Sequence, residues 1–170
     1  MKHLYFMRHG MSEMNKRGLF AGRSETPLAK EGIEQCRQAG KSLKGTQIDI
    51  IVSSPMERAY ESAKIIAQEI GYPEDKIILN DLFMERDLGE LEGSNYIKGL
   101  PMNRYNGVEH SRDLIERAKQ ALRFLEGLDG DDLLVVSHSA IGRALKYVID
   151  PSIKFSELGS FANAEIVKLF

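Results

Sequence analysis

The sequence predicts an α/β fold, a three-layer α/β/α sandwich built on a mostly parallel central sheet. Short uninterrupted apolar runs recur along the chain, and longer segments with helical spacing of apolar residues separate them. Apolar runs that do not alternate with polar residues are typical of strands buried on both faces, as in parallel sheets covered by helices. The 170 residues contain no repeat, linker or change of composition, so we expect residues 1–170 to form a single domain.

Five apolar runs are the predicted strands. They are Leu4–Met7, Ile48–Val52, Ile77–Leu79, Leu133–Val136 and Ile166–Leu169. The first run is too short for the core of a signal peptide or for a membrane span. The single cysteine, Cys36, excludes an intramolecular disulfide and is compatible with a reducing compartment. We therefore expect a cytoplasmic protein.

Four segments with apolar residues at helical spacing are the predicted helices. They run from Thr26-Pro27 to Leu43, from Pro55 to Ile70, from Arg112 to Leu128 and from about Ala140 to Ile149. Thr26 before a first-turn proline is a favourable N-cap, and Ala29 lacks a capping side chain, so we expect the first helix to begin at Thr26. Gly71 is suited to the C-cap of the second helix, and Pro151 ends the fourth.

The charge of the chain excludes some classes of partner. A formal net charge of -2 and a pI of about 6.1 provide no broad positive field, so neither nucleic acid nor an anionic membrane is an expected partner. The four histidines show no ligand spacing such as HxxxH, so we expect neither a metal site nor a cofactor. The sequence does not predict an oligomeric state.

Two histidines directly follow predicted strands. In parallel sheets covered by helices, ligands bind beyond the carboxyl ends of the strands. Arg8 and His9 follow the first strand, and His138 follows the fourth, while Arg58 lies at the start of the helix after the second strand. Guanidinium groups bind phosphate oxygens in bidentate fashion, and a neutral imidazole can attack phosphorus. The arrangement predicts a site for a phosphoryl dianion.

A reaction of this kind needs a proton donor for the leaving alcohol. The candidate is Glu85, in a loop after the third predicted strand. A carboxyl group beside a bound dianion in a closed pocket keeps its proton more readily, which suits a general acid.

Each of these residues also has an ordinary structural interpretation. A histidine at a strand end is more often satisfied by backbone groups than catalytic, and an arginine such as Arg58 is usually a surface ion-pair residue. Glu85 stands in a charge-rich loop, and such loops are normally only solvated. The joint position of His9 and His138 after two strands is the observation that favours a site.

Five short motifs occur along the chain. They are Arg8-His9-Gly10 with Ser12 and Asn15, Pro27-Leu28 with Gly32 and Gln35, Ser53-Ser54-Pro55 with Arg58-Ala59, Glu85 with Gly89 and Glu92-Gly93, and Val136-Ser137-His138. In this order they resemble the histidine phosphatase superfamily, the phosphoglycerate mutase-like proteins, from residue 3 to about residue 167. Each motif alone is weak, but five in register are very improbable by chance.

The resemblance implies a role for each motif residue. His9 is the implied phosphoacceptor, Arg8, Arg58 and His138 are the implied ligands of the phosphoryl oxygens, and Glu85 is the implied acid that later activates water. It further implies phosphate or substrate contacts for Asn15, Ser12, Arg23 and Ser139, where Ser139 replaces a glycine usual in the family. The implied activity is that of a metal-independent phosphoric monoester hydrolase acting on a small phosphorylated substrate, with a phosphoprotein as a further possibility.

The segment 94–109 is short and rich in Asn, Gly and Pro, and many relatives have a long helical cap here. We expect a short cap and an open pocket, which favours a phosphatase over a mutase because a mutase must shield its phosphoenzyme from water. The segment is interpreted either as a lip facing the substrate or as packing on the domain.

Two further alternatives stay open. One is a protein phosphohistidine phosphatase, since an open site would also admit a phosphorylated side chain. The other is a catalytically silent module that binds phosphorylated ligands in the same pocket. A pure binder has no use for both a nucleophile at His9 and an acid at Glu85, so we favour the enzyme.

Overall fold

The computed structural model describes residues 1–170 and confirms the α/β fold class. The strands are β1 (His3–Arg8), β2 (Ile50–Ser53), β3 (Ile78–Leu79), β4 (Asp132–Ser137) and β5 (Ile166–Lys168). They form one sheet in the order β3-β2-β4-β1-β5. The first four strands of the chain run parallel, and β5 pairs antiparallel with β1 at the edge. The predicted mostly parallel sheet is therefore confirmed.

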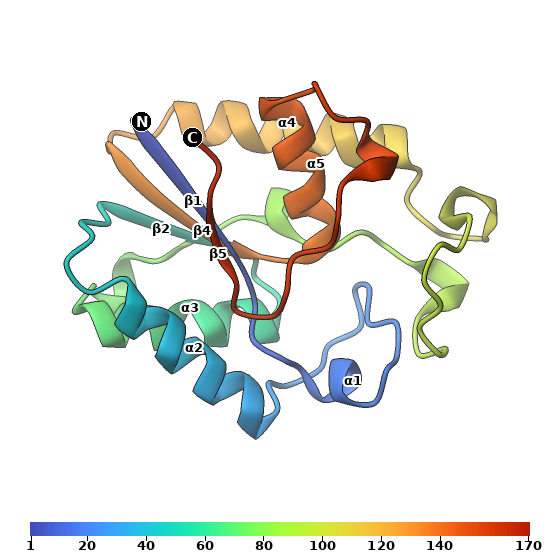
Figure 1. The fold of residues 1–170 in the computed structure, drawn as a ribbon, viewed down its shortest axis with the longest axis horizontal. Coiled ribbons are helices and arrows are strands. Elements are labelled where there is room, and N and C mark those ends of the chain that lie inside the picture. Colours follow the sequence, from blue (N-terminus) through green and yellow to red (C-terminus); the bar gives the residue numbers. More distant parts are fainter.

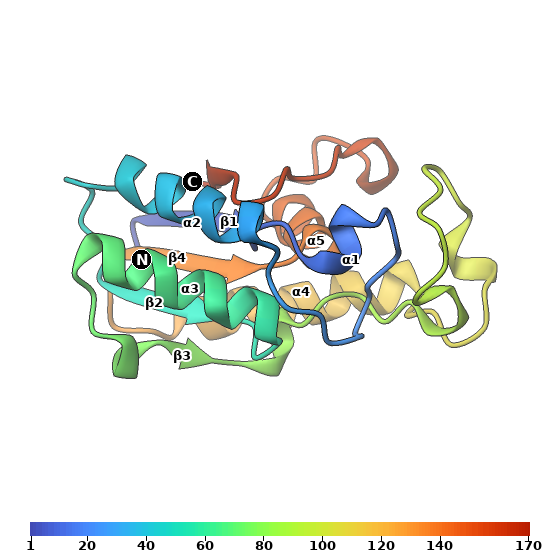
Figure 2. The same cartoon turned by 90° about the horizontal axis from the view of Figure 1, so that it is seen from below.

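Helices cover both faces of this sheet. They are α1 (Glu13–Lys16), α2 (Lys30–Ser42), α3 (Glu57–Ile70), α4 (Ser111–Glu126) and α5 (Ser139–Ile149). Figure 1 shows α4 and α5 on one side of the sheet and α2 and α3 on the other, and Figure 2 shows α2 and α3 side by side. Short 3-10 turns cover residues 74–76, 81–83, 89–91, 102–104 and 155–157.

The central strand β4 explains why its sequence is apolar without alternation. Leu133 and Val135 point into a cluster with residues of α4 and α5, while Leu134 and Val136 point into a cluster with residues of α2 and α3. All four are fully buried. Because side chains alternate across a strand, a strand between two helical layers needs an apolar residue at every position.

The predicted start of the first helix is wrong. Helix α2 begins at Lys30, and its N-cap, Ala29, makes no side-chain capping bond. The Thr26 hydroxyl instead accepts from Met14 N at 3.2 Å. Leu28, which lies between Thr26 and Lys30, forms an isolated β-bridge with Ser12. This contact with the loop after β1 holds the segment extended, although its local sequence favours a helix. The other predicted boundaries lie within two residues of the observed ones.

The end of α3 follows the prediction. Gly71 is its C-cap in the left-handed conformation, with φ of 73°. Glycine adopts this conformation without a steric penalty, so α3 ends where the sequence places a glycine.

The segment 94–109 packs on the molecule along much of its length. Its apolar residues Leu100, Met102, Tyr105 and Val108 lie against a small cluster of Phe20, Leu88 and Leu91. Tyr96 and Ile97 are each 55% exposed, and the Tyr96 ring stacks against Phe20 with centroids 5.1 Å apart. Packing therefore accounts for the second half of the segment, and the first half leaves a tyrosine at the surface.

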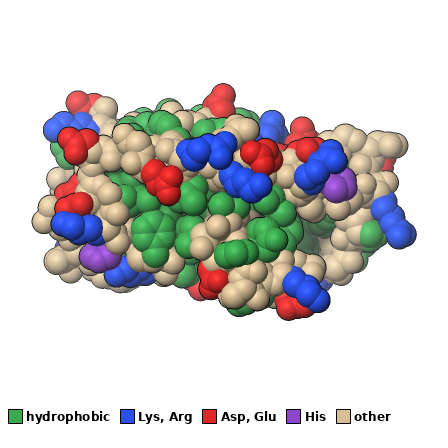
Figure 3. Space-filling model, turned by 90° about the horizontal axis from the view of Figure 1, so that it is seen from above, with side chains coloured by type: hydrophobic (Ala, Val, Ile, Leu, Met, Phe, Trp, Pro, Cys, Tyr) green, Lys and Arg blue, Asp and Glu red, His purple; other side chains and the backbone are tan.

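Figure 3 views the molecule from the side of α4, where hydrophobic side chains gather at the centre of the face among charged ones. A groove of about 600 Å³ between α4 and α5 is lined by Arg112, Ile115, Glu116, Lys119, Tyr147, Val148 and Pro151. None of the predicted site residues lines it. None of the helices combines the length and the apolar character needed to cross a bilayer.

Candidate active site

The predicted site residues converge at the carboxyl edge of three neighbouring strands. His9 follows β1, His138 follows β4 as the N-cap of α5, and Arg58 lies in the first turn of α3 after β2. Because β2, β4 and β1 are adjacent and parallel, the three side chains leave the same end of the sheet. The ring centroids of His9 and His138 lie 5.1 Å apart, close enough for both rings to contact one phosphoryl group.

The His9 ring is held in one tautomer. Its Nδ1 lies 2.6 Å from the carbonyl oxygen of Gly10, which can only accept, so Nδ1 carries the proton and Nε2 keeps its lone pair. Burial lowers the pKa of His9 well below its ordinary value, and the positive charges of Arg58 and Arg8 act in the same direction. His9 is therefore a neutral imidazole at neutral pH, the form that a nucleophile requires.

Arg58 is almost completely buried, with 1% of its surface exposed. Its Nε donates to Nε2 of His9 at 3.2 Å, and its two terminal nitrogens donate to the carbonyl oxygens of Ser24 at 2.9 Å and Gly22 at 2.6 Å. Burial lowers the pKa of this guanidinium, and nearby carboxylates such as Glu85 oppose the shift. The residue is thus not a surface ion-pair residue but a fixed cation beside the predicted nucleophile.

His138 is fully buried and has one unsatisfied ring nitrogen. Its Nε2 lies 2.8 Å from the hydroxyl of Ser54, which also accepts from Met56 N at 3.3 Å. The Ser54 hydroxyl can donate to Nε2 or accept from it, and the first arrangement places the ring proton of His138 on Nδ1. Burial lowers the pKa of His138 well below its ordinary value, so the ring is neutral.

Two buried side-chain nitrogens in the site have no hydrogen-bond partner within the protein. They are Nδ1 of His138 and Nε of Arg8, whose Nη1 donates to the carbonyl oxygen of Phe161 at 2.7 Å. Buried polar groups are almost always hydrogen-bonded, and an unpaired one costs about 1–3 kcal/mol. Phosphoryl oxygens are acceptors that suit Nε of Arg8 and, when it carries the ring proton, Nδ1 of His138.

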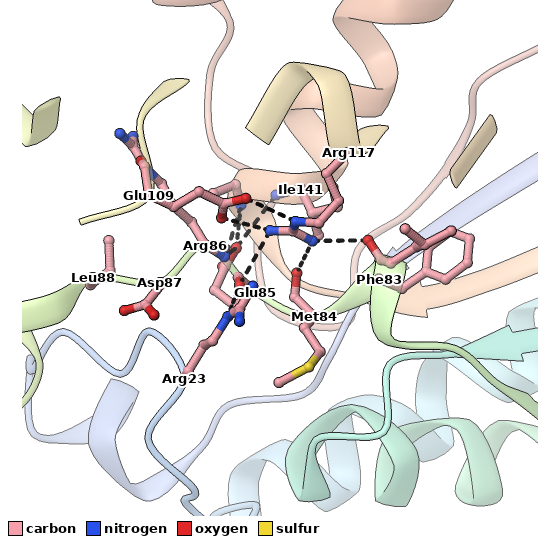
Figure 4. A network of polar contacts seen from close by, with 12 residues as sticks. Arg23, Phe83, Met84, Glu85, Arg86, Asp87, Leu88, Glu109, Arg117 and Ile141 are labelled. Atoms are coloured by element: carbon pink, nitrogen blue, oxygen red, sulfur yellow. Dashed lines mark hydrogen bonds and ion pairs between the residues drawn. The ribbon is translucent and has the colours of Figure 1, made fainter. Parts of the chain in front are cut away.

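The carboxylate of Glu85 lies at the N-terminal end of α5, next to His138. It accepts hydrogen bonds from the backbone N–H groups of Ala140 at 3.2 Å and of Ile141 at 3.4 Å, and from that of Arg86 at 2.8 Å. Figure 4 shows this carboxylate close to Ile141 and within a network of polar contacts. The loop after the third strand therefore brings Glu85 to the start of α5, where His138 is the N-cap.

The remaining predicted contacts divide into two groups. Arg23 lies beside the acid, because its Nε donates to the carbonyl oxygen of Glu85 at 3.2 Å. Asn15 accepts through Oδ1 from Ser12 N and from the side chain of Asn163. Its side-chain nitrogen, Nδ2, makes no hydrogen bond within the chain. Both residues retain donors for a substrate.

The two predicted serines differ. The Ser12 hydroxyl accepts from Asn15 N at 3.2 Å as the N-cap of α1, and Ser12 is fully buried, so these contacts give no support to a phosphate contact. Ser139 is the first residue of α5 after His138, and its hydroxyl makes no hydrogen bond within the chain.

The site contains residues to which the sequence analysis assigned no role. Ser54 orients His138, and Ser62 accepts from Gly10 N at 3.0 Å and donates to the carbonyl oxygen of Arg58 at 2.7 Å. Asn163 donates to the carbonyl oxygen of His9 at 3.1 Å. The position of Ser54 directly after β2 could have identified it as a site residue, whereas nothing in the local sequence singles out Asn163.

Glu92 fixes the loop of residues 22–24, which in turn holds Arg58. Its carboxylate accepts from Arg23 N at 2.8 Å and from the Ser24 hydroxyl at 2.7 Å. These contacts fix the loop whose carbonyl oxygens hold Arg58. Glu92 belongs to the motif of Glu85, Gly89 and Glu92-Gly93, but only the structure shows that it fixes the loop that holds Arg58.

The rings of His9 and His138 are enclosed, and the openness of the pocket over them stays a prediction. His9 is 3% exposed and His138 is fully buried, although the segment 94–109 is short. The reason is that Arg58, Ser54 and the loop carrying Asn163 enclose the rings from other directions. Nowhere do three or more His, Cys, Asp or Glu side chains come together as a metal site requires, and metal independence stays a prediction.

Comparison with known proteins places these features in context. A family model described as Histidine phosphatase superfamily (branch 1) matches residues 4–169. A Hydrogenobacter thermophilus protein named Putative phosphoserine phosphatase 2 is 30% identical over 159 residues, which cover 85% of this chain and 77% of that protein. A 2,3-bisphosphoglycerate-dependent phosphoglycerate mutase of Parvibaculum lavamentivorans is 39% identical over 94 residues, 54% of this chain. That match spans 45% of the mutase, less than half its length.

A solved structure shows the same fold. A mycobacterial glucosyl-3-phosphoglycerate phosphatase superposes with a TM-score of 0.86 over 99% of this chain and 90% of its own, at 22% sequence identity. The arrangement of strands and helices is therefore shared with an enzyme of that name, while the identity is too low to carry its substrate across.

Proposed function

The chain belongs to the histidine phosphatase superfamily, and from this premise we propose that it is a phosphatase that hydrolyses phosphomonoesters through a phosphohistidine intermediate on His9. The observation that carries the proposal is the state of His9: a neutral, buried ring whose Nδ1 proton is held by Gly10 and whose Nε2 lone pair faces a fixed guanidinium. A neutral imidazole with this tautomer is a nucleophile for phosphorus.

In the first step, the phosphoryl group binds with its oxygens toward Arg8, Arg58 and His138. The N–H of Arg58 Nε moves from Nε2 of His9 to a phosphoryl oxygen, Nε2 then attacks phosphorus, and the bond between phosphorus and the alcohol oxygen breaks. Glu85 gives its proton to that oxygen, so the alcohol leaves neutral. The hydrogen bond from Nδ1 to the Gly10 carbonyl stabilises the positive charge that develops on the ring.

In the second step, water attacks the phosphorus of the phosphohistidine. Glu85, now a carboxylate, takes a proton from this water, and the bond between phosphorus and Nε2 breaks. Inorganic phosphate leaves, His9 returns to its neutral form, and Glu85 is protonated again. The guanidinium of Arg58, already fixed by two carbonyl oxygens, stabilises the charge on the phosphoryl oxygens in both steps.

Turnover of p-nitrophenyl phosphate by chelator-treated protein tests the proposal. We expect His9→Ala to abolish turnover and the wild type to yield a phosphorylated His9 peptide on rapid acid-free quenching. His3→Ala is the matched control, because His3 lies at the other end of β1 and pairs with Asp132, and it should leave the rate unchanged. Equal rates for wild type and His9→Ala would remove the enzyme proposal and leave the silent binding module.

The role of Glu85 has a test of its own. Glu85→Gln should lower kcat/KM for alkyl phosphates by about 100-fold or more, because alkoxides leave poorly without a proton. The loss on p-nitrophenyl phosphate should be much smaller, since nitrophenolate leaves unaided. The ratio kcat/KM is the quantity to compare, because it reports the step in which the leaving group departs. Equal losses on both substrates would exclude Glu85 as the acid.

The substrate is tested by a screen of sugar phosphates, nucleotides, phosphoserine and phosphopeptides, run beside a mutase assay on phosphoglycerate. Phosphatase turnover without phosphoglycerate isomerisation is the expected result. The relatives support a phosphatase over a mutase, because the match covers 77% of the phosphatase-named protein but only 45% of the mutase.

A further inference from the structure

A buried ion pair lies behind the loop that carries Glu85. Arg117 on α4 and Glu109 at the end of the segment 94–109 have side chains that are only 14% and 13% exposed. The two groups meet as a fork, with Nε of Arg117 donating to Oε1 of Glu109 at 2.9 Å and Nη2 donating to Oε2 at 2.8 Å. Bidentate pairs of this kind are the most sharply defined in geometry.

The same guanidinium also binds the backbone of the acid loop. Its Nη1 donates to the carbonyl oxygens of Leu82 at 2.9 Å and Met84 at 2.7 Å, and its Nη2 approaches that of Glu85 at 3.4 Å. Figure 4 shows Arg117 between Glu109 and this stretch of chain. Residues 84–87 lie outside helices and strands, so no regular pattern of backbone hydrogen bonds fixes this loop.

Glu109 adds backbone contacts on the other side of Glu85. Its N–H donates to the carbonyl oxygen of Asp87 at 2.9 Å, and its own carbonyl oxygen accepts from Nε of Arg86 at 2.7 Å. The carbonyl oxygens before Glu85 are therefore bound by Arg117, and the residues after it are bound by Glu109.

We propose that Arg117 and Glu109 are positioning residues for the general acid, an inference that rests on the proposed function of Glu85. A carboxyl group takes its place from its backbone, and a displacement of about 1 Å can cost about 100-fold in rate. The hydrogen bonds of Arg117 go only to Glu109 and to loop carbonyl oxygens, so its direct contacts fix the backbone that carries Glu85. Its charge also lowers the pKa of His138, and lysine at this position keeps that charge. The pair fixes where the acid meets the leaving oxygen.

Leaving-group dependence separates this role from a merely structural one. An ion pair that only stabilises the fold lowers the active fraction and affects every substrate equally. An ion pair that positions the acid affects substrates in proportion to their need for a proton. Comparison of an alkyl phosphate with p-nitrophenyl phosphate therefore distinguishes the two roles within one variant.

The experiment uses Arg117→Lys and Glu109→Gln in the full chain. Lysine keeps the charge but offers one point of contact in place of the fork, and glutamine keeps the shape of Glu109. We expect kcat/KM for the alkyl phosphate to fall about 10- to 100-fold, with less than about a 3-fold loss on p-nitrophenyl phosphate. Arg123→Lys is the matched control on the same helix, where the side chain is 63% exposed, and it should match wild type on both substrates.

The possible outcomes are distinct. Equal losses on both substrates, or no loss in either variant, would overturn the positioning role while leaving the phosphatase in place. Should Arg117→Lys not fold, Glu109→Gln decides on the same criterion, with thermal unfolding measured for each variant. An inactive wild type would instead remove the proposed function, and a Glu85→Gln variant without leaving-group selectivity would remove the acid itself.

Discussion

The reactivity expected of the two histidines depends on which atom bonds each ring nitrogen. The carbonyl of Gly10 fixes the proton of His9 on Nδ1, and a Ser54 hydroxyl that donates to Nε2 places the proton of His138 on Nδ1 as well. The two rings then have opposite tasks. His9 presents a lone pair to phosphorus, and His138 presents an N–H group to a phosphoryl oxygen.

Removal of the Ser54 hydroxyl should therefore weaken catalysis without removing any group that contacts the substrate. In Ser54→Ala the neutral His138 ring can place its proton on either nitrogen, and we expect kcat/KM on p-nitrophenyl phosphate to fall about 10-fold. Ser53→Ala is the control, because Ser53 is equally buried and its hydroxyl donates to the Ser54 carbonyl instead of a ring. Nitrogen NMR shifts of His138 that match wild type in Ser54→Ala would contradict the tautomer argument.

Several residues that sequence reasoning found lie close after strands, as Ser54 does, whereas others that it missed reach the site from elsewhere in the fold. His9 and His138 come directly after strands, and Arg58 lies in the first turn of the helix after β2, so the architecture places all three at one edge. Asn163 and Arg117 reach the site from a C-terminal loop and from the middle of a helix. Their roles follow from hydrogen bonds to backbone carbonyls, and no residue pattern encodes which carbonyl lies within reach.

Among the elements, the packing of the loop after β1 against α2 has the tightest tolerance. A Cβ atom on Gly32 would lie 2.1 Å from the carbonyl oxygen of Met11, and one on Gly10 would lie 2.4 Å from the carbonyl oxygen of Gly32. Backbone therefore touches backbone where the helix supports the His9 loop. This contact also explains the late start of α2, because Pro27 and Leu28 are held extended against the same loop.

Gly32→Ala tests this contact against helix propensity. Alanine in place of glycine within a helix is favourable by about 1 kcal/mol, which predicts a gain in stability. The clash with a backbone oxygen opposes it, and overpacking of this kind costs about 1–3 kcal/mol or more, so we expect a net loss. Urea unfolding should show a lower midpoint for Gly32→Ala and little change for Gly159→Ala, where no atom lies within 4 Å of the added Cβ. A more stable Gly32→Ala variant would show that the loop yields easily.

For the molecule as a whole, the sequence predicts the layers but not the order of the strands. Continuous apolar runs between helices are sufficient to predict a buried parallel sheet. The order β3-β2-β4-β1-β5 places the fourth strand in the chain between the first and the second, and this arrangement brings the ends of β1, β4 and β2, which precede His9, His138 and Arg58, to neighbouring positions. The pairing of β1 with β4 joins residues 129 positions apart and that of β2 with β4 joins residues 83 positions apart, and no local pattern specifies either.

The burial of two neutral histidines should make the stability of the entire fold depend on pH. In the folded chain the pKa values of His9 and His138 lie well below the ordinary value, which the unfolded chain regains at about 6.5. Below that pH the unfolded chain binds more protons than the folded one, so the free energy of unfolding falls as pH falls. Above it both states are neutral at these rings and the contribution is constant.

Between about pH 6.5 and 5, each of the two rings should contribute a slope of up to about 1.4 kcal/mol per pH unit to the free energy of unfolding. This range lies above the pH at which ordinary carboxylates titrate. Urea unfolding across this range measures the slope. His9→Asn should reduce the slope by about one ring's share. A wild-type stability that is flat from pH 6.5 to 5 would mean that the two rings accept protons in the folded protein, and it would remove the neutral nucleophile on which the proposed chemistry depends.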